Sequence, residues 1–134
     1  MVKIESNKAI IKKSNKEVFD YLAVPENYSI LMPSKVRSFT FDDDSADLDI
    51  EGIGKIELSF TRREFPSLIE MKPQNKVPFS FDIKWHLNEL SETETEVQAV
   101  INADLNFMMR MMAEKLLADF LNVQVHKLEE KLNS

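Results

Sequence analysis

The sequence predicts an α+β fold in which a curved antiparallel β-sheet wraps around a long C-terminal α-helix. Between residues 35 and 106 apolar and polar residues alternate, which is typical of strands with one buried face. From residue 107 the period becomes helical and continues to about residue 132, enough for a helix of ~39 Å. Because an apolar sheet face must be covered and no other predicted element is long enough, we expect the sheet to curve around this helix.

The N-terminal region predicts one strand followed by two short helices. Residues 2–11 begin with alternating apolar and charged side chains and are predicted to form a strand. Ser14 and Glu17 have the spacing of a capping box, which predicts a helix that begins at Ser14. A second short helix should begin at Pro25, because proline suits a first helical turn, and should end before Pro33.

About six antiparallel strands are predicted between the short helices and the terminal helix. The alternating segments are residues 36–41, 47–51, 55–60, 68–72, 79–88 and 97–105. Gly52 and Gly54, which are the only glycines in the chain, predict a hairpin bend between the second and third of these strands. Residues 42–45 and 92–95 are predicted turns.

The terminal helix has a predicted start and a predicted buried stripe. Asn106 is a suitable N-cap, because its side chain can accept a hydrogen bond from a free backbone N–H. The apolar stripe consists of Met109, Ala113, Leu116, Leu117, Phe120, Leu121 and Leu128.

Composition limits the classes of protein to which the chain could belong. Its 134 residues, 43% hydrophobic and 30% charged, predict one globular domain over residues 1–134. The net charge of −6 argues against nucleic acid as a partner. No apolar run is long enough for a membrane span, and the charged, alternating N-terminus does not resemble a signal peptide, so we expect a cytoplasmic protein. With no cysteine and two histidines, the sequence predicts neither a metal site nor a cofactor.

Several segments together resemble the START/Bet v 1-like (SRPBCC) superfamily and its helix-grip fold. They are VFDYLAVPENYSILMP near the start, FSFDIKWHL and TEVQAVINADLN in the long strands, and FMMRMMAEKLLADFLNVQVHKLEEKL at the end. The first of these is similar to the polyketide cyclase-like branch. The resemblance implies a hydrophobic cavity between the terminal helix and the concave sheet, but it carries over no catalytic residue.

The predicted ligand-binding residues are those expected to face this cavity. They are Tyr28, Phe60, Arg62, Phe81, Trp85, Met109, Met112, Leu116, Phe120 and Gln124. Met109 and Met112 belong to a group of four methionines within residues 108–112, which either line a pliable pocket, pack in the core, or contact a partner. The hydroxyls of Tyr21 and Tyr28 have two interpretations: they are polar groups of the pocket, or the rings pack in the core and the hydroxyls reach solvent.

Two polar candidates each have a functional and a structural interpretation. Arg62 is in phase with the inward residues of its strand and would meet a ligand carboxylate, unless it reaches solvent at the end of the strand or a bulge at Arg62-Arg63 resets the phase. Gln124 lies inside the apolar stripe, where its amide would hydrogen-bond either a ligand or a loop backbone.

The remaining polar features are predicted to be solvated. His86 falls on the polar face of its strand, and His126 on the outer face of the terminal helix. The acidic residues 42–51 lack the glycine and the glutamate of a calcium-binding EF-hand loop. Gly52 and Gly54 lack the third glycine of a dinucleotide-binding loop, where Glu57 stands.

Three functions follow as hypotheses. The first is the binding or carriage of a small hydrophobic molecule, such as a lipid, a polyketide-like or an isoprenoid compound. The second is a cyclase or dehydratase type of enzyme, for which only Arg62, Glu70 and the tyrosines would offer inward polar groups. The third is a protein-interaction module of the chaperone-activator kind, and a homodimer is compatible with the same surfaces.

Overall fold

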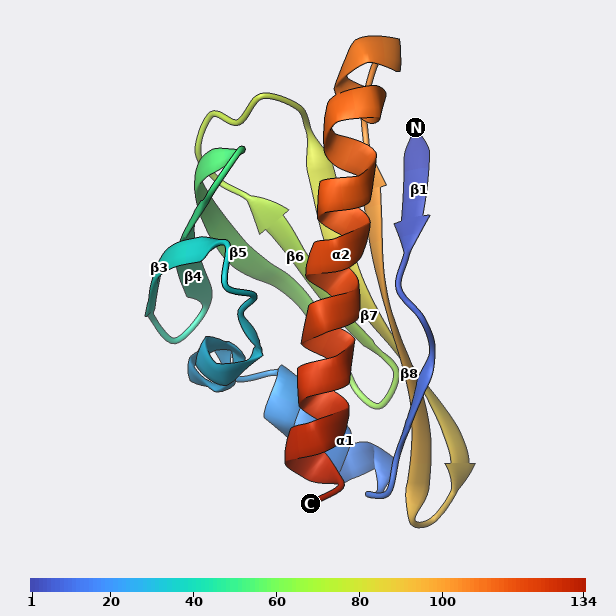
Figure 1. The fold of residues 1–134 in the computed structure, drawn as a ribbon. Helices are drawn as coiled ribbons and strands as arrows, with labels where there is room; N and C mark the ends of the chain where they lie inside the picture. Colours follow the sequence, from blue (N-terminus) through green and yellow to red (C-terminus); the bar gives the residue numbers. More distant parts are fainter.

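The computed structural model describes residues 1–134 and confirms the predicted α+β architecture (Figure 1). In chain order the elements are β1 (Val2–Glu5), β2 (Ala9–Ile11), α1 (Asn15–Leu22), the 3₁₀ helix η1 (Pro25–Leu31), β3 (Val36–Phe41), β4 (Ser45–Ile50), β5 (Gly54–Glu64), β6 (Leu68–Pro73), β7 (Phe81–Ser91), β8 (Glu94–Ala103) and α2 (Phe107–Leu132). The eight strands form one sheet in the order β1-β8-β7-β6-β5-β4-β3, with β2 also paired to β8. The helix α2 lies across one face of this curved sheet (Figure 1).

The predicted helix starts are confirmed. Ser14 caps α1 as a capping box, in which its side chain accepts from the backbone N–H of Glu17 and the Glu17 carboxylate accepts from the backbone N–H of Ser14. Asn106 caps α2 by accepting a hydrogen bond of 2.9 Å from the backbone N–H of Met109. These signals depend on a few neighbouring residues, so tertiary packing does not alter them.

The predicted first strand is divided in two. Residues 6–8 leave the ladder, so β1 and β2 pair with different parts of β8. The Ser6 hydroxyl accepts a hydrogen bond from the Ala99 backbone N–H, and the Ser6 carbonyl accepts one from the Gln98 side chain. Side-chain bonds therefore replace part of the regular ladder at this position, which a single alternating strand did not predict.

The strand β5 contains the second departure from prediction. Its pairing with β6 shifts register between Phe60 and Arg62, so two residues of β5 lie opposite one residue of β6. Such a bulge reverses which residues face the core beyond it. Before this point, β5 begins at the predicted glycine bend, where Gly52 and Gly54 have φ values of +91° and +104°.

The core lies between α2 and the sheet as one cluster of 29 buried apolar residues. The buried residues of α2 are Ala113, Leu117, Phe120, Leu121, Gln124, Val125 and Leu128. Met109 and Leu116, which the predicted stripe included, are only half-buried because they lie at its margins. No helix of the structure combines the length and the hydropathy that crossing a bilayer requires.

Candidate functional site

The space between α2 and the sheet is almost filled. Two small cavities remain in the core, with volumes of about 10 Å³ and about 20 Å³. Each has room for about one water molecule, whereas small-molecule sites usually measure roughly 300–1,000 Å³. The large interior cavity that the resemblance implied is therefore not present in this conformation.

A larger space opens beside α2, where the helix faces the segment that joins η1 to β3. This cleft has a volume of about 500 Å³ and is open to solvent on one side. It is lined by Pro33, Ser34, Lys35, Ile50, Met111, Met112, Lys115, Leu116, Asp119, Phe120 and Val123. Lys115 and Asp119 form an exposed ion pair of 2.9 Å along the helix. Most of the other residues that line the cleft are apolar.

Phe120 separates the cleft from the core. It is 7% exposed, and its side chain lines the cleft and both interior cavities. No other residue lines all three spaces. Phe120 is therefore the wall that the cleft shares with both interior cavities.

Gln124 lies one helical turn beyond Phe120 and lines the first cavity. Its side chain is buried and forms no hydrogen bond with any protein group, although the other ten residues around that cavity are hydrophobic. Of the two interpretations that the sequence left open, the structure therefore contradicts the hydrogen bond to a loop backbone.

Tyr28 also lines the first cavity, but its hydroxyl is not free to bind a ligand. Its O–H donates a hydrogen bond of 2.6 Å to the Leu22 carbonyl oxygen, and its ring packs edge-on against Phe60 and Trp85. Burial raises the pKa of Tyr28 well above its ordinary value. The hydroxyl is thus a neutral structural donor, and the Tyr21 hydroxyl similarly bonds the Asn27 carbonyl.

The first turn and a half of α2 exposes a cluster of large apolar side chains. Phe107, Met108, Met111 and Met112, which we call the α2 apolar end, are each 71–79% exposed. Met111 and Met112 also form the rim of the cleft. The methionine group therefore contributes to a surface and to the cleft, not to the interior cavities.

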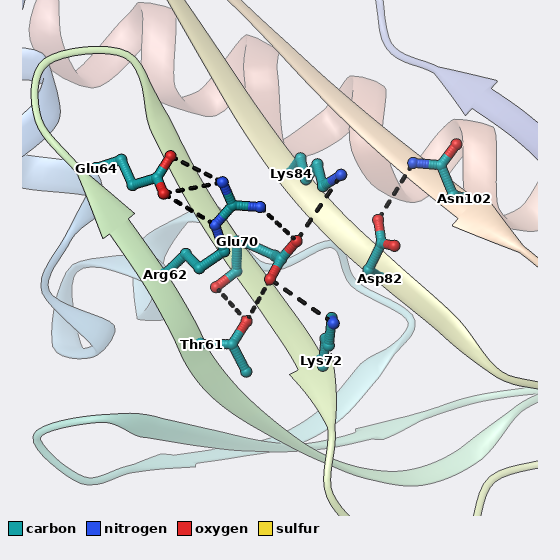
Figure 2. A network of polar contacts seen from close by, with 8 residues as sticks. All are labelled: Thr61, Arg62, Glu64, Glu70, Lys72, Asp82, Lys84 and Asn102. Carbon is teal, nitrogen blue, oxygen red and sulfur yellow. Dashed lines mark hydrogen bonds and ion pairs between the residues drawn. The ribbon is translucent and has the colours of Figure 1, made fainter.

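Arg62 does not point into the core, so of the interpretations that the sequence left open the inward orientation is contradicted and the bulge is confirmed. The bulge at Thr61 places Arg62 on the face of the sheet away from α2, where it contacts the carboxylates of Glu64 and Glu70 (Figure 2). Glu70 is also on this outer face, because it alternates with the buried residues Ile69 and Met71.

Glu70 is the centre of a polar network on the outer face (Figure 2). Its buried carboxylate accepts a hydrogen bond of 2.9 Å from the Thr61 hydroxyl. Arg62, Lys72 and Lys84 place cationic nitrogens 3.7–3.9 Å from its oxygens. This arrangement compensates the buried charge, which indicates a structural role.

The two histidines lie on the surface, as predicted. His86 is exposed on β7, and burial of part of its ring, then Lys84 and Lys3, lower its pKa. His126 forms an exposed contact of 3.4 Å with Glu130 on α2.

The structure brings seven of the ten predicted ligand residues around the three spaces. Tyr28, Phe60, Phe120 and Gln124 line the first cavity, Phe81 and Phe120 line the second, and Met112, Leu116 and Phe120 line the cleft. Arg62, Trp85 and Met109 line none of them. Whether any of these residues binds a ligand remains a prediction.

Sequence reasoning missed the cleft wall formed by residues 33–35 and Ile50. The proline that ends η1 was a signal for the position of this loop, but not for its approach to α2. Met32 and Met71, which line the first cavity, were also missed.

Comparison with known proteins identifies the fold. No protein-family model and no curated protein sequence matches the chain. Among solved structures, XoxI from Bacillus cereus is similar, with a TM-score of 0.77 and 12% identity over 98% of this chain and 96% of that one. A START superfamily protein from Mycobacterium smegmatis has a TM-score of 0.75 and 14% identity over 97% and 96% of the two chains.

A norcoclaurine synthase has the same architecture. Norcoclaurine synthase from Thalictrum flavum, in complex with dopamine and hydroxybenzaldehyde, has a TM-score of 0.74 and 10% identity, over 97% of this chain and 85% of that one. The chain therefore has the START/Bet v 1-like (SRPBCC) helix-grip fold, as its sequence resemblance predicted. Identities this low establish the fold alone, and membership of the polyketide cyclase-like branch stays a prediction.

Proposed function

We propose that this protein binds a small hydrophobic molecule in the cleft between α2 and residues 33–35. The observation that carries the proposal is the cleft volume of about 500 Å³, which falls within the range of small-molecule sites. The filled core makes the cleft the place where such a molecule would first be held.

The chemistry of the lining supports an apolar ligand. Ile50, Leu116, Phe120 and Val123 contribute apolar side chains to the cleft, and Met111 provides a flexible rim that can adapt to an irregular shape. Norcoclaurine synthase, which has the same fold, is seen with two small aromatic molecules, which makes such compounds reasonable first probes.

A fluorescence titration with the neutral probe N-phenyl-1-naphthylamine tests the proposal. We expect saturable enhancement with the unaltered protein and at least about tenfold weaker binding for Leu116→Glu, because a carboxylate in the cleft must be desolvated by the probe. Leu90→Glu is the matched control, since Leu90 is 45% exposed on β7 and lies outside the cleft. Absence of saturable enhancement, or equal weakening by both variants, would contradict the proposal.

The α2 apolar end favours a second candidate, a protein-interaction module. Clustered apolar side chains of this size on a surface often mark a contact with another protein. Sedimentation velocity over a range of concentrations would detect a homodimer, and Met108→Glu should abolish it if the α2 apolar end forms the contact. A monomer at all concentrations would remove the homodimer but not other partners.

The enzyme alternative has less support from the geometry. Tyr28 is the one titratable residue around the two interior cavities, and its hydroxyl is already bonded to Leu22. Acid–base catalysis needs positioned titratable groups, and Glu70 and Arg62 lie on the outer face of the sheet.

A single domain and a cytoplasmic location stay predictions.

A further inference from the structure

Gln124 is the buried polar side chain that forms no hydrogen bond, whereas the fully enclosed polar atoms without a partner are Asn15 Oδ1 and Trp85 Nε1. Five polar side chains are buried: Ser6, Asn15, Glu70, Thr95 and Gln124. The first four each form at least one side-chain hydrogen bond, to Ala99, Pro66, Thr61 and Lys13 respectively. The Gln124 amide, at 4% exposure, forms none.

The Gln124 amide is not among the fully enclosed polar atoms without a partner, so it keeps a little accessible surface, and the first cavity that it lines has room for about one water molecule. Leucine or methionine would fill the same place in α2 without presenting a polar group to the cavity. The amide forms no hydrogen bond with the protein and lines a cavity with ten hydrophobic residues, so a water-sized polar group in that cavity is the partner that its position allows.

We propose that Gln124 recognises an uncharged hydrogen-bonding group of the ligand, such as a hydroxyl or a carbonyl. This inference rests on the proposed function. The ligand's polar group would enter the first cavity, and its apolar body would extend past Phe120 into the cleft. Phe120 and Gln124 are four residues apart on α2, so they lie on the same face of the helix.

The surroundings of Gln124 favour a neutral partner over an ion. No Lys, Arg, Asp or Glu lines the first cavity, so a ligand charge placed there would be buried without a counter-charge. The carboxamide can both donate and accept, which suits a hydroxyl or a carbonyl. Met32 and Met71 also line the cavity and can adopt other rotamers to make room.

Isothermal titration with three probes of one framework tests this inference. Naphthalene has no polar group, 2-naphthol has a neutral hydroxyl, and 2-naphthoate has a negative charge. We expect 2-naphthol to bind about 3- to 10-fold more tightly than naphthalene, the usual effect of one added hydrogen bond. Gln124→Leu should abolish this difference and leave the naphthalene affinity unchanged, whereas Gln74→Leu, at an exposed loop position, should preserve it.

A stability measurement separates recognition from a structural role. If Gln124 has no partner in the closed protein, Gln124→Leu should melt at the same temperature as the unaltered protein or above it. Gln124→Met, which keeps the unbranched shape, repeats the measurement if the leucine variant folds poorly. A fall of several degrees in both variants would show that the amide stabilises the protein in the absence of a ligand, and would overturn the inference.

The binding outcomes also distinguish the inference from the proposed function. Equal affinity for 2-naphthol and naphthalene overturns the role of Gln124 and leaves the cleft as a hydrophobic site. Tighter binding of 2-naphthoate than of 2-naphthol overturns the preference for a neutral group. If none of the three probes binds, and N-phenyl-1-naphthylamine does not bind either, the proposed function is overturned. The inference about Gln124 is then overturned as well.

Discussion

Lys127 of α2 donates a hydrogen bond of 2.7 Å from its ammonium group to the carbonyl oxygen of Met32. Met32 directly precedes residues 33–35, which form the wall of the cleft opposite the helix. This one bond therefore ties the cleft wall to α2, across 95 residues of sequence.

Lys127→Met should loosen the cleft wall. We expect a loss of about 1–2 kcal/mol of unfolding free energy, because a hydrogen bond from a charged donor is removed and the Met32 carbonyl loses its partner. Urea denaturation measures this loss, and probe dissociation from the cleft should be faster. Lys131→Met is the control, since Lys131 is exposed near the end of α2 and its side chain forms no bond. Equal effects of the two variants would mean that the bond does not stabilise the wall.

Phe120→Leu should open the passage between the cleft and the core. The smaller side chain leaves part of the separating volume empty, so we expect faster association of 2-naphthol in a stopped-flow experiment. Phe120→Ala should lower the unfolding free energy by about 3–5 kcal/mol, as usual for truncation of a buried phenylalanine. An unchanged association rate with reduced stability would show that the ring packs in the core without controlling access.

Glu70→Gln should destabilise the protein, because it removes the central charge of the polar network on the outer face of the sheet. The substitution keeps the shape of the side chain but leaves Arg62, Lys72 and Lys84 without the buried negative charge that they surround. Because these cations are partly exposed, we expect a loss of about 1–3 kcal/mol, below that of a fully buried pair. Glu64→Gln is the control, and its exposed ion pair should contribute less than about 1 kcal/mol. Comparable losses for the two variants would contradict the structural role of Glu70.

The His86 imidazole should make stability depend on pH. Its pKa in the folded protein is lowered below the ordinary value of 6.5, first by burial and then by Lys84 and Lys3. Below the ordinary pKa the unfolded chain therefore binds more protons than the folded one, so stability falls as the pH decreases from about 7 through the folded pKa. Denaturation midpoints between pH 7.5 and pH 5 should fall less in His86→Gln than in the unaltered protein. Identical pH profiles would exclude this contribution.

Local signals predicted the ends of the helices and the hairpin. Ser14 with Glu17, and Asn106 alone, define helix starts through hydrogen bonds that span three residues. Gly52 and Gly54 adopt positive φ values that other residues rarely adopt, so their sequence position was sufficient to locate the bend. None of these features requires a contact with a distant part of the chain.

Arg62 is a position at which the alternating pattern of apolar and polar residues no longer predicts which face of the sheet a side chain occupies. The phase that begins at Ile56 predicts an inward side chain, and a bulge at Thr61 turns it outward. Nothing in the local alternation marks that bulge, because it arises from the pairing of β5 with β6 and from the polar partners around Glu70. Ser6 interrupts the first strand for a similar reason, since its bonds are to Ala99 and Gln98.

The sequence by itself determined the curved sheet, the long helix and the order of elements, because hydrophobic period and capping depend on nearby residues. Only the tertiary structure decided that the core is filled, that the open space lies beside α2, and that the Gln124 amide has no partner. These properties depend on how closely segments far apart in the chain approach one another, and on side-chain volumes summed over both faces of the core. A pattern along one strand or one helix contains no measure of that distance.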